Sequence, residues 1–223
     1  MNGSWPEAYK KGVQDFYGRD FIVSPDVLIP RPETEMIIDA VLNLAGVAYL
    51  PGVRPAPARL PKKMRILDIG TGSGCVAVTL KAELPEADVS ACDISEKALM
   101  MAQRNAHKIG VQVNFFQSDL MNEAHSEYDV IVANLPYVDK GWEWLDHKRL
   151  EAEPGIALYA EDGGLELIKK LIRQVAKRSA HSFSEKYLVL EADPCQHEAI
   201  KKYALTYGLE HIETRGFILL FGI

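Results

Sequence analysis

The sequence has 223 residues, of which 48% are apolar, and its 25 basic and 31 acidic residues give a net charge of −6 at pH 7. This length supports one hydrophobic core with a small appendage, and the acidic balance argues against a general nucleic-acid binder, which usually has a basic face. The longest apolar stretch, residues 40–53, contains Asn43, Gly46 and Pro51 and is too short to span a bilayer.

The three cysteines, Cys75, Cys92 and Cys195, lie far apart and form no C-x-x-C pair. Isolated thiols of this kind fit a reducing compartment, and the N-terminus does not resemble a signal peptide. We therefore expect a cytoplasmic protein that does not engage a membrane. The six histidines show no metal-ligand spacing, so we expect no metal site.

Residues 1–63 are expected to form a hairpin, a helix and a linker ahead of the main domain. Apolar runs on either side of a glycine predict a short hairpin over 16–23. Pro32-Glu33-Thr34-Glu35 is expected to open a helix of about 13 residues, because proline and acidic residues suit a first helical turn. Residues 46–63 contain four prolines and two glycines, which predicts a loop or linker.

From residue 64 to 223 strands and helices alternate, which predicts an α/β domain with a mostly parallel sheet and helices on both faces. Strands are expected near 64–69, 88–92, 112–116, 128–133, 186–191 and 216–222, and helices near 74–84, 95–109, 163–180 and 195–207. The pattern by itself does not give the direction of the final strand.

A glycine-rich turn joins the first of these strands to its helix, in the run Asp68-Ile69-Gly70-Thr71-Gly72-Ser73-Gly74. A dinucleotide site would read G-x-G-x-x-G and would place a pyrophosphate on the helix N-terminus. Here Asp68 would repel a pyrophosphate and attract a cation instead. Asp93 ends the next strand, 23 positions after Gly70, where an acid can accept hydrogen bonds from a ribose. A cation and a ribose without a phosphate together describe S-adenosylmethionine.

Asn134-Leu135-Pro136-Tyr137 follows the apolar strand expected at 128–133 and therefore lies where open α/β sheets bind their ligands. The Asn134 side-chain oxygen and a neighbouring backbone carbonyl are two acceptors, which suits a planar –NH₂ group with two hydrogens to donate. An aromatic ring at Tyr137 can cover the flat face of that group. The order of these motifs along the chain predicts a methyltransferase that acts on a planar nitrogen.

Each motif also has a purely structural interpretation. Glycines after a strand are often only a turn, and Asp93 or Ser95 could be a helix N-cap. Arg31 and Glu33 could be solvated residues of a first helical turn.

Taken together, these residues resemble the HemK/PrmC family, which methylates the glutamine amide of peptide-chain release factors. The similar segments are Leu28–Glu35, Asp68–Gly74, Asp93–Ser95 with Ala98, Leu99, Asn105 and Ala106, Ser118–Leu120, Asn134–Tyr137, Glu153–Pro154 with Ala157 and Leu158, Asp162–Leu165, and Glu191 with Gln196. The resemblance runs from about Tyr9 to Ile223.

This resemblance implies a Rossmann-like class I methyltransferase fold, with a seven-stranded, mostly parallel sheet whose last strand is antiparallel. It implies S-adenosylmethionine as cofactor and a release factor as protein partner. The catalytic residues would be Asn134, Leu135, Pro136 and Tyr137. The cofactor would be bound by Asn134 together with Arg31, Pro32, Thr34, Asp68, Gly70, Thr71, Gly72, Ser73, Gly74, Asp93, Ile94, Asp119 and Leu120.

The sequence departs from the family pattern in two places. The family usually reads Asn-Pro-Pro-Tyr, and Leu135 stands at the second position. Because the acceptor there is a main-chain carbonyl, we expect amide binding to survive. The family usually also carries an N-terminal helical domain, and we expect this chain to begin at the connector to it, so that the substrate is gripped in another way.

The main alternative is a methyltransferase acting on the exocyclic amine of adenine in rRNA or DNA, because Asn-Leu-Pro-Tyr also resembles the tetrapeptide of the rRNA adenine dimethylases. Such enzymes take the base out of its stack and are expected to have a basic surface and a C-terminal RNA-binding domain. The net charge of −6 and the Arg31–Glu35 segment argue against this alternative. A catalytically idle cofactor-binding subunit is a third alternative.

Overall fold

The computed structural model describes residues 5–47, 63–179 and 185–223. The loop expected at 46–63 lies almost entirely outside the described residues. The centre of the fold is a seven-stranded sheet with the strand order β5-β4-β3-β6-β7-β9-β8. Its strands are β3 (Arg65–Ile69), β4 (Asp88–Asp93), β5 (Asn114–Gln117), β6 (Val130–Ala133), β7 (Tyr187–Glu191), β8 (Glu210–Arg215) and β9 (Ile218–Gly222).

The direction of β9 distinguishes it from the other strands of this sheet. It pairs antiparallel with β7 on one side and with β8 on the other, whereas β5, β4, β3, β6 and β7 pair in parallel. The predicted mostly parallel sheet with an antiparallel last strand is therefore confirmed. A strand at β8 was not predicted, because all six of its residues are exposed and no apolar alternation marks them.

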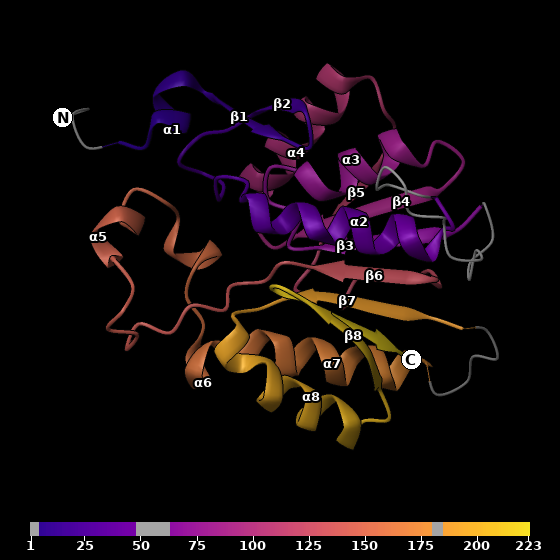
Figure 1. Ribbon diagram of the computed structural model, residues 1–223. Helices are drawn as coiled ribbons and strands as arrows, with labels where there is room; N and C mark the ends of the chain where they lie inside the picture. Colours follow the sequence, from indigo (N-terminus) through magenta and orange to yellow (C-terminus); the bar gives the residue numbers. More distant parts are fainter. Residues whose placement is uncertain (1–4, 48–62, 180–184) are drawn as a thin grey trace.

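Helices cover both faces of the sheet (Figure 1). Alternate residues of each strand point to opposite faces, so that Ile66 and Val130 belong to one core cluster and Leu67 and Ile131 to the other. The first cluster includes α2 (Glu35–Leu44) and α3 (Cys75–Glu83), with α4 (Glu96–Ile109) beside them; the second includes α7 (Glu166–Ser179) and α8 (His197–Thr206). Burial on both faces explains why β3, β6 and β7 are largely apolar.

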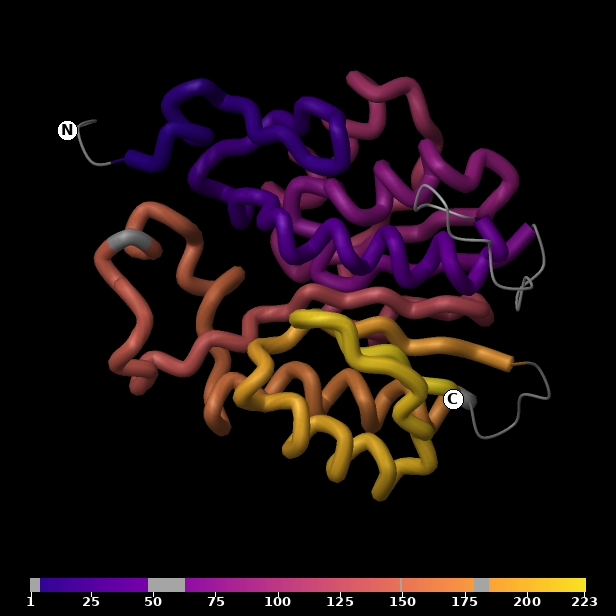
Figure 2. The backbone as a smooth tube through the Cα atoms, in the orientation of Figure 1, coloured from indigo at the N-terminus to yellow at the C-terminus, as the bar shows by residue number. Residues whose placement is uncertain are grey.

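The N-terminal segment packs against the sheet domain rather than apart from it (Figure 2). It contains α1 (Glu7–Lys11), the predicted hairpin as β1 (Val13–Phe16) and β2 (Arg19–Ile22), and a 3-10 turn η1 (Pro32–Thr34) that leads into α2. The side chain of Asn105 on α4 accepts from Ile22 N at 2.7 Å and donates to Ser73 O at 2.8 Å. A single buried amide therefore ties the hairpin to the glycine-rich turn.

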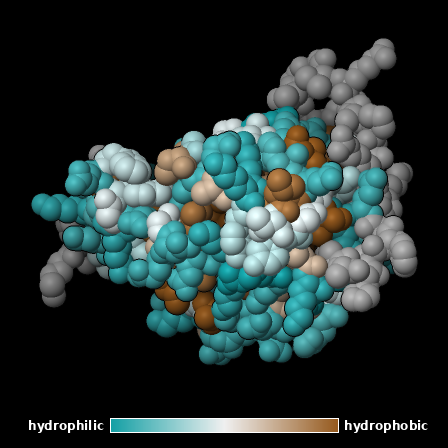
Figure 3. Space-filling model, turned by 90° about the horizontal axis from the view of Figure 1, so that it is seen from below, coloured by the Kyte–Doolittle hydropathy of each residue, from teal (hydrophilic) through white to brown (hydrophobic). Residues whose placement is uncertain are grey.

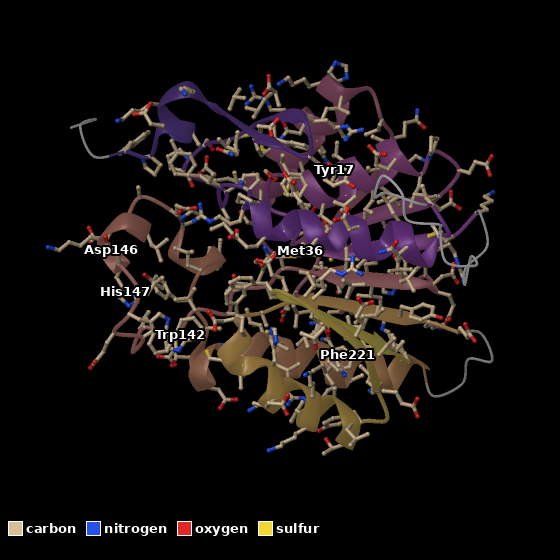
Figure 4. The ribbon with its side chains drawn as sticks, in the orientation of Figure 1. Tyr17, Met36, Trp142, Asp146, His147 and Phe221 are labelled. Carbon is tan, nitrogen blue, oxygen red and sulfur yellow. The ribbon has the colours of Figure 1, made fainter. Side chains whose placement is uncertain are left out.

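The segment between β6 and α7 forms a separate lobe near the carboxyl ends of the parallel strands. It carries α5 (His147–Leu150), the 3-10 turn η2 (Gly155–Ala157) and α6 (Glu161–Gly164). Figure 4 shows Trp142, Asp146 and His147 together in this lobe, where a His147 ring nitrogen lies 2.9 Å from Trp142 O. The helix expected over 163–180 begins later, at Glu166, because Asp162, Gly163 and Gly164 have left-handed backbone angles.

The outer face formed by α7 and α8 is largely hydrophilic, with scattered apolar side chains (Figure 3). Among the described residues, no helix is both long enough and apolar enough to cross a bilayer.

Candidate active site

A cavity of about 230 Å³ opens at the carboxyl ends of the parallel strands. Its walls are the loops that follow β3, β4, β5 and β6, together with several residues from the segments 26–34 and 154–157. Of the predicted site residues, those that line it are Arg31, Thr34, Asp68, Gly70, Thr71, Gly72, Ser73, Asp93, Ile94, Asp119, Leu120, Asn134, Leu135 and Pro136. Pro32, Gly74 and Tyr137 do not line it.

The glycine-rich turn is held by the neighbouring strand β4. Gly70 N and Thr71 N both donate to Cys92 O, at 2.9 and 3.0 Å, and Gly72 N donates to Asp93 Oδ2 at 2.9 Å. Gly72 has a φ of +57°, and a Cβ built on it would meet no atom within 4 Å, so its backbone is open to a ligand. The turn thus presents bare main chain to the cavity.

Gly74 serves helix packing instead of the cavity. A Cβ at this position would lie 2.9 Å from the Ala102 Cβ, and the φ of +81° already favours glycine. Its missing side chain therefore lets α4 approach the start of α3.

Asp68 is a buried carboxylate on the cavity wall. Its Oδ2 accepts from the Thr71 hydroxyl at 2.7 Å and from Ala77 N at 3.2 Å. Burial raises its pKa to about 7, although these two hydrogen bonds oppose the rise. A cation in the cavity would favour the charged form of this group.

Asp93 holds its two oxygens in fixed directions. Oδ2 accepts from Gly72 N and Oδ1 accepts from Ser95 N, both at 2.9 Å. Burial raises the pKa of this carboxyl, and the backbone hydrogen bonds oppose the rise. Each oxygen keeps a further lone pair, which is the arrangement needed to accept from a hydroxyl group of a ligand. The N-cap of α4 is Ser95, which accepts from Ala98 N, so that Asp93 is not the cap.

Asn134 and Leu135 begin the loop after β6. Asn134 Nδ2 donates to the Thr34 hydroxyl at 3.0 Å, which leaves the side-chain oxygen for other partners. The Leu135 side chain is buried, and its Cδ2 would lie 3.1 Å from a Cβ on Gly70. Leucine at this position therefore packs under the glycine-rich turn and brings the two loops together.

Tyr137 turns its hydroxyl away from the cavity and donates to Glu191 Oε1 at 3.2 Å. Its backbone oxygen accepts from Gln196 Nε2 at 2.9 Å, and the same nitrogen donates to Gly163 O at 2.7 Å. Gly164 lies against this backbone so closely that a Cβ would be 1.9 Å from Tyr137 O. The loop that carries Asn134 is thus clamped at its far end.

Asp119 and Leu120 border the cavity beyond β5. Asp119 pairs with Lys170 of α7 at 2.6 Å. Leu120 has a φ of +52°, a conformation that costs about 1 kcal/mol or more for a residue with a side chain. The Ser118 hydroxyl donates to Leu120 O at 2.7 Å and helps to hold it there. Backbone strain at a ligand-facing residue fits a functional position.

Glu153 binds the N-terminal segment, which closes one side of the cavity. This buried carboxylate accepts from Ile29 N at 3.0 Å through Oε2 and pairs with the Arg31 guanidinium through Oε1. The roles of Asp26, Val27 and Ile156 in the cavity wall carry no signal in the sequence. Glu153 and Glu191 stand in segments that resemble the family, which is the signal that could have singled them out.

The charged side chains that line the cavity suit a cationic nucleoside better than a phosphate. Among the described residues that line it, four are aspartates, and the basic side chain of Arg31 is already paired with Glu153. Carboxylates at Asp68 and Asp93 would repel a pyrophosphate, whereas they can face a sulfonium or ammonium group and ribose hydroxyls. The residues therefore fit S-adenosylmethionine.

Comparison with known proteins gives the family. The model of the methyltransferase small domain matches residues 56–150. A release factor glutamine methyltransferase of Neisseria gonorrhoeae is 40% identical over 218 residues, which cover 96% of this chain and 72% of that protein. The chain belongs to the release factor glutamine methyltransferase family. This confirms the predicted resemblance.

A second relative shows how much of the family's length is represented. The release factor glutamine methyltransferase of Koribacter versatilis is 44% identical over 175 residues, which cover 76% of this chain and 57% of that protein. The chain thus spans between about half and three quarters of the length of these two relatives.

Solved structures agree on the fold of this family member. A methyltransferase from Pyrococcus furiosus superposes with a TM-score of 0.61 at 19% identity, covering 92% of this chain and 89% of that protein. The predicted class I methyltransferase fold is confirmed.

Proposed function

We propose that this protein transfers a methyl group from S-adenosylmethionine to the side-chain amide nitrogen of a glutamine in a protein, and that this protein is a peptide-chain release factor. The observation that carries the proposal is the placement of Asn134. It lies beside the glycine-rich turn, and its –NH₂ group donates a hydrogen bond to Thr34. Its oxygen is left for a hydrogen-bond donor. A primary amide offers such a donor on the atom to be methylated.

We propose the following roles for the residues that would bind the cofactor. Asp93 accepts from the ribose, Gly72 offers open backbone to the amino-acid end with Gly70 beside it, and Asp119 and Leu120 flank the adenine. Arg31 and Thr34 close over the site from the N-terminal segment. When bound, S-adenosylmethionine supplies an electrophilic methyl group on a positively charged sulfur.

The protein's own contribution is to orient a poor nucleophile. The lone pair of an amide nitrogen is delocalised into its carbonyl, so the –NH₂ group must be fixed rather than deprotonated. The Asn134 side-chain oxygen and the Leu135 carbonyl accept its two hydrogens and set the direction of the lone pair. Such positioning supplies roughly 7–11 kcal/mol in favourable cases, and fixed acceptors stabilise the positive charge that develops on nitrogen. Tyr137 lies off the cavity wall and holds the end of the loop that carries Asn134 through its hydrogen bond to Glu191.

A labelled-methyl assay tests the proposal. The protein is incubated with methyl-labelled S-adenosylmethionine and offered a release factor and rRNA side by side, with a release factor whose target glutamine is replaced by alanine as control. We expect label in the unaltered release factor and none in the control. Label in RNA alone would instead support methylation of an adenine amine.

Asp93→Ala is expected to weaken binding of S-adenosylmethionine by more than about tenfold, because two charge-assisted acceptors for the ribose are lost. Isothermal titration calorimetry measures the change. Asp88→Ala, at the exposed beginning of the same strand, is the matched control and should bind as the unaltered protein does. An unchanged affinity of Asp93→Ala would remove this residue from the ribose site.

We expect Asp68 to release protons when the cofactor binds. Its pKa of about 7 in the free protein is raised mainly by burial, and a bound cation lowers it again, so binding near pH 6.5 expels part of a proton. Affinity should therefore rise with pH and level off above pH 7. Calorimetry in two buffers of different ionisation enthalpy measures the release, and Asp68→Asn should abolish it. The same release from Asp68→Asn would contradict the assignment.

A further inference from the structure

Glu191, the last residue of β7, is a buried carboxylate for which the assigned chemistry has no use. It is 1% exposed and is separate from the cavity wall. Its Oε1 accepts from the Tyr137 hydroxyl, while Oε2 makes no hydrogen bond of normal geometry within the described part of the chain. No lysine or arginine of that part pairs with it. A buried, unpaired carboxylate is costly, which indicates that it serves a purpose.

Three groups that can donate a hydrogen bond lie near this carboxylate. Tyr137 contacts Oε1, and the Thr34 hydroxyl and the Asn134 amide lie close enough to lower the pKa of the group. Burial dominates nevertheless and, with the charge of Glu33, raises the pKa to about 7. Above that pH the group is a carboxylate, which can only accept.

Because the carboxylate can only accept hydrogen bonds, it decides how the neighbouring groups are oriented. Thr34 is 3% exposed, and its hydroxyl has a single hydrogen. When that hydrogen points at Glu191, the hydroxyl oxygen is left to accept from Asn134 Nδ2, which lies 3.0 Å away. The Asn134 side-chain oxygen must then face the cavity. If Thr34 donated to Asn134 instead, the amide would turn over and present its –NH₂ group to the substrate.

We propose that Glu191 is a positioning residue that sets the direction of the hydrogen bonds from Asn134 to Thr34 to Glu191, and so keeps an acceptor facing the nitrogen to be methylated. The inference rests on the proposed function, because it concerns the same Asn134 oxygen. It also deepens that function. A site that always presents a hydrogen-bond acceptor to the substrate selects a nitrogen that carries hydrogens.

Glu191→Gln keeps the shape of the side chain but adds a donor, so that the direction of the chain of hydrogen bonds is no longer imposed. At pH 8, kcat for methylation of the release factor is expected to fall roughly tenfold or more, while KM and the cofactor Kd stay within about twofold. Glu198→Gln on α8, an exposed glutamate, is the matched control and should leave kcat unchanged.

A double-mutant cycle separates orientation from mere structural support. Because Glu191 acts on Asn134 through Thr34, Thr34→Val and Glu191→Gln should each lower kcat. The double variant should have a kcat little lower than that of either single variant. Additive losses would overturn the proposal, as would a Glu191→Gln variant with unaltered kcat.

Nuclear magnetic resonance of side-chain amides tests the orientation without any substrate. The Asn134 signals are identified by their loss in Asn134→Ala. In Glu191→Gln they should shift and lose protection from hydrogen exchange, whereas the amide of Asn105, which donates to Ile22 O and Ser73 O, should not change. Unchanged Asn134 signals would overturn the inference. Changed signals in a protein that methylates no glutamine would refute the proposed function and leave the orientation standing.

Discussion

Asn134→Ala is expected to lower the rate of methyl transfer by about 100- to 1,000-fold, the loss seen when one fixed hydrogen-bonding group is removed from a transition state. The alanine variant keeps the backbone carbonyls but lacks the side-chain oxygen that accepts from the substrate amide. Its contact with Thr34 is also lost. Single-turnover transfer of labelled methyl to a release factor measures the rate.

Cofactor binding distinguishes this role from a role in holding the cofactor. Binding of S-adenosylmethionine to Asn134→Ala should stay within about threefold of the unaltered protein, because Asp93 and the glycine-rich turn remain. Asn114→Ala, at the exposed beginning of β5, is the control and should alter neither quantity. A parallel loss of affinity and rate in Asn134→Ala would contradict the assigned role.

Gly164→Ala should destabilise the protein by more than about 3 kcal/mol and abolish activity. A Cβ on Gly164 would lie 1.9 Å from Tyr137 O and 2.5 Å from Gln196 Nε2, and the φ of +79° adds strain. The backbone that carries Asn134 must then move. Equilibrium denaturation in urea gives the free energy of unfolding, and the labelled-methyl assay gives the activity.

Gly163→Ala is a matched control for Gly164→Ala, because the two glycines are neighbours with similar backbone angles. Gly163 has a φ of +66°, but a Cβ there would meet nothing within 4 Å. Its replacement should cost only the strain of a left-handed residue, about 1–2 kcal/mol, and should leave most of the activity. Equal losses in the two variants would show that backbone strain, and not the contact with Tyr137, is responsible.

Secondary structure was predictable where the local pattern and the final environment agree. β3 and β6 are buried on both faces, so that each is a largely apolar run that can be found from the sequence. β8 is an exposed edge strand that is held mainly by pairing with β9, and a pairing partner leaves no mark on the residues that receive it. Its prediction requires knowledge of the sheet.

The site was predictable to the extent that its residues follow strands. Asp68, Asp93 and Asn134 each lie near, at or just after the end of a strand of one parallel sheet, and strands of that kind bring their carboxyl ends to a common edge. The cavity does bring these three together. Their chemical roles stay predictions. The packing of the Tyr137 ring on the substrate amide also stays a prediction; its hydroxyl is bound to Glu191, and Tyr137, Gly74 and Pro32 lie off the cavity wall.

The sequence by itself determined the order of most strands and helices, the acidic character of the ligand site and the family, because each depends on residue types at short spacings along the chain. The tertiary structure alone decided which way Asn134 points. That direction depends on Thr34, which is 100 positions before Asn134 in the sequence, and on Glu191, which is 57 positions after it. Hydrogen-bond direction is a property of groups that meet in space, and no local pattern encodes it.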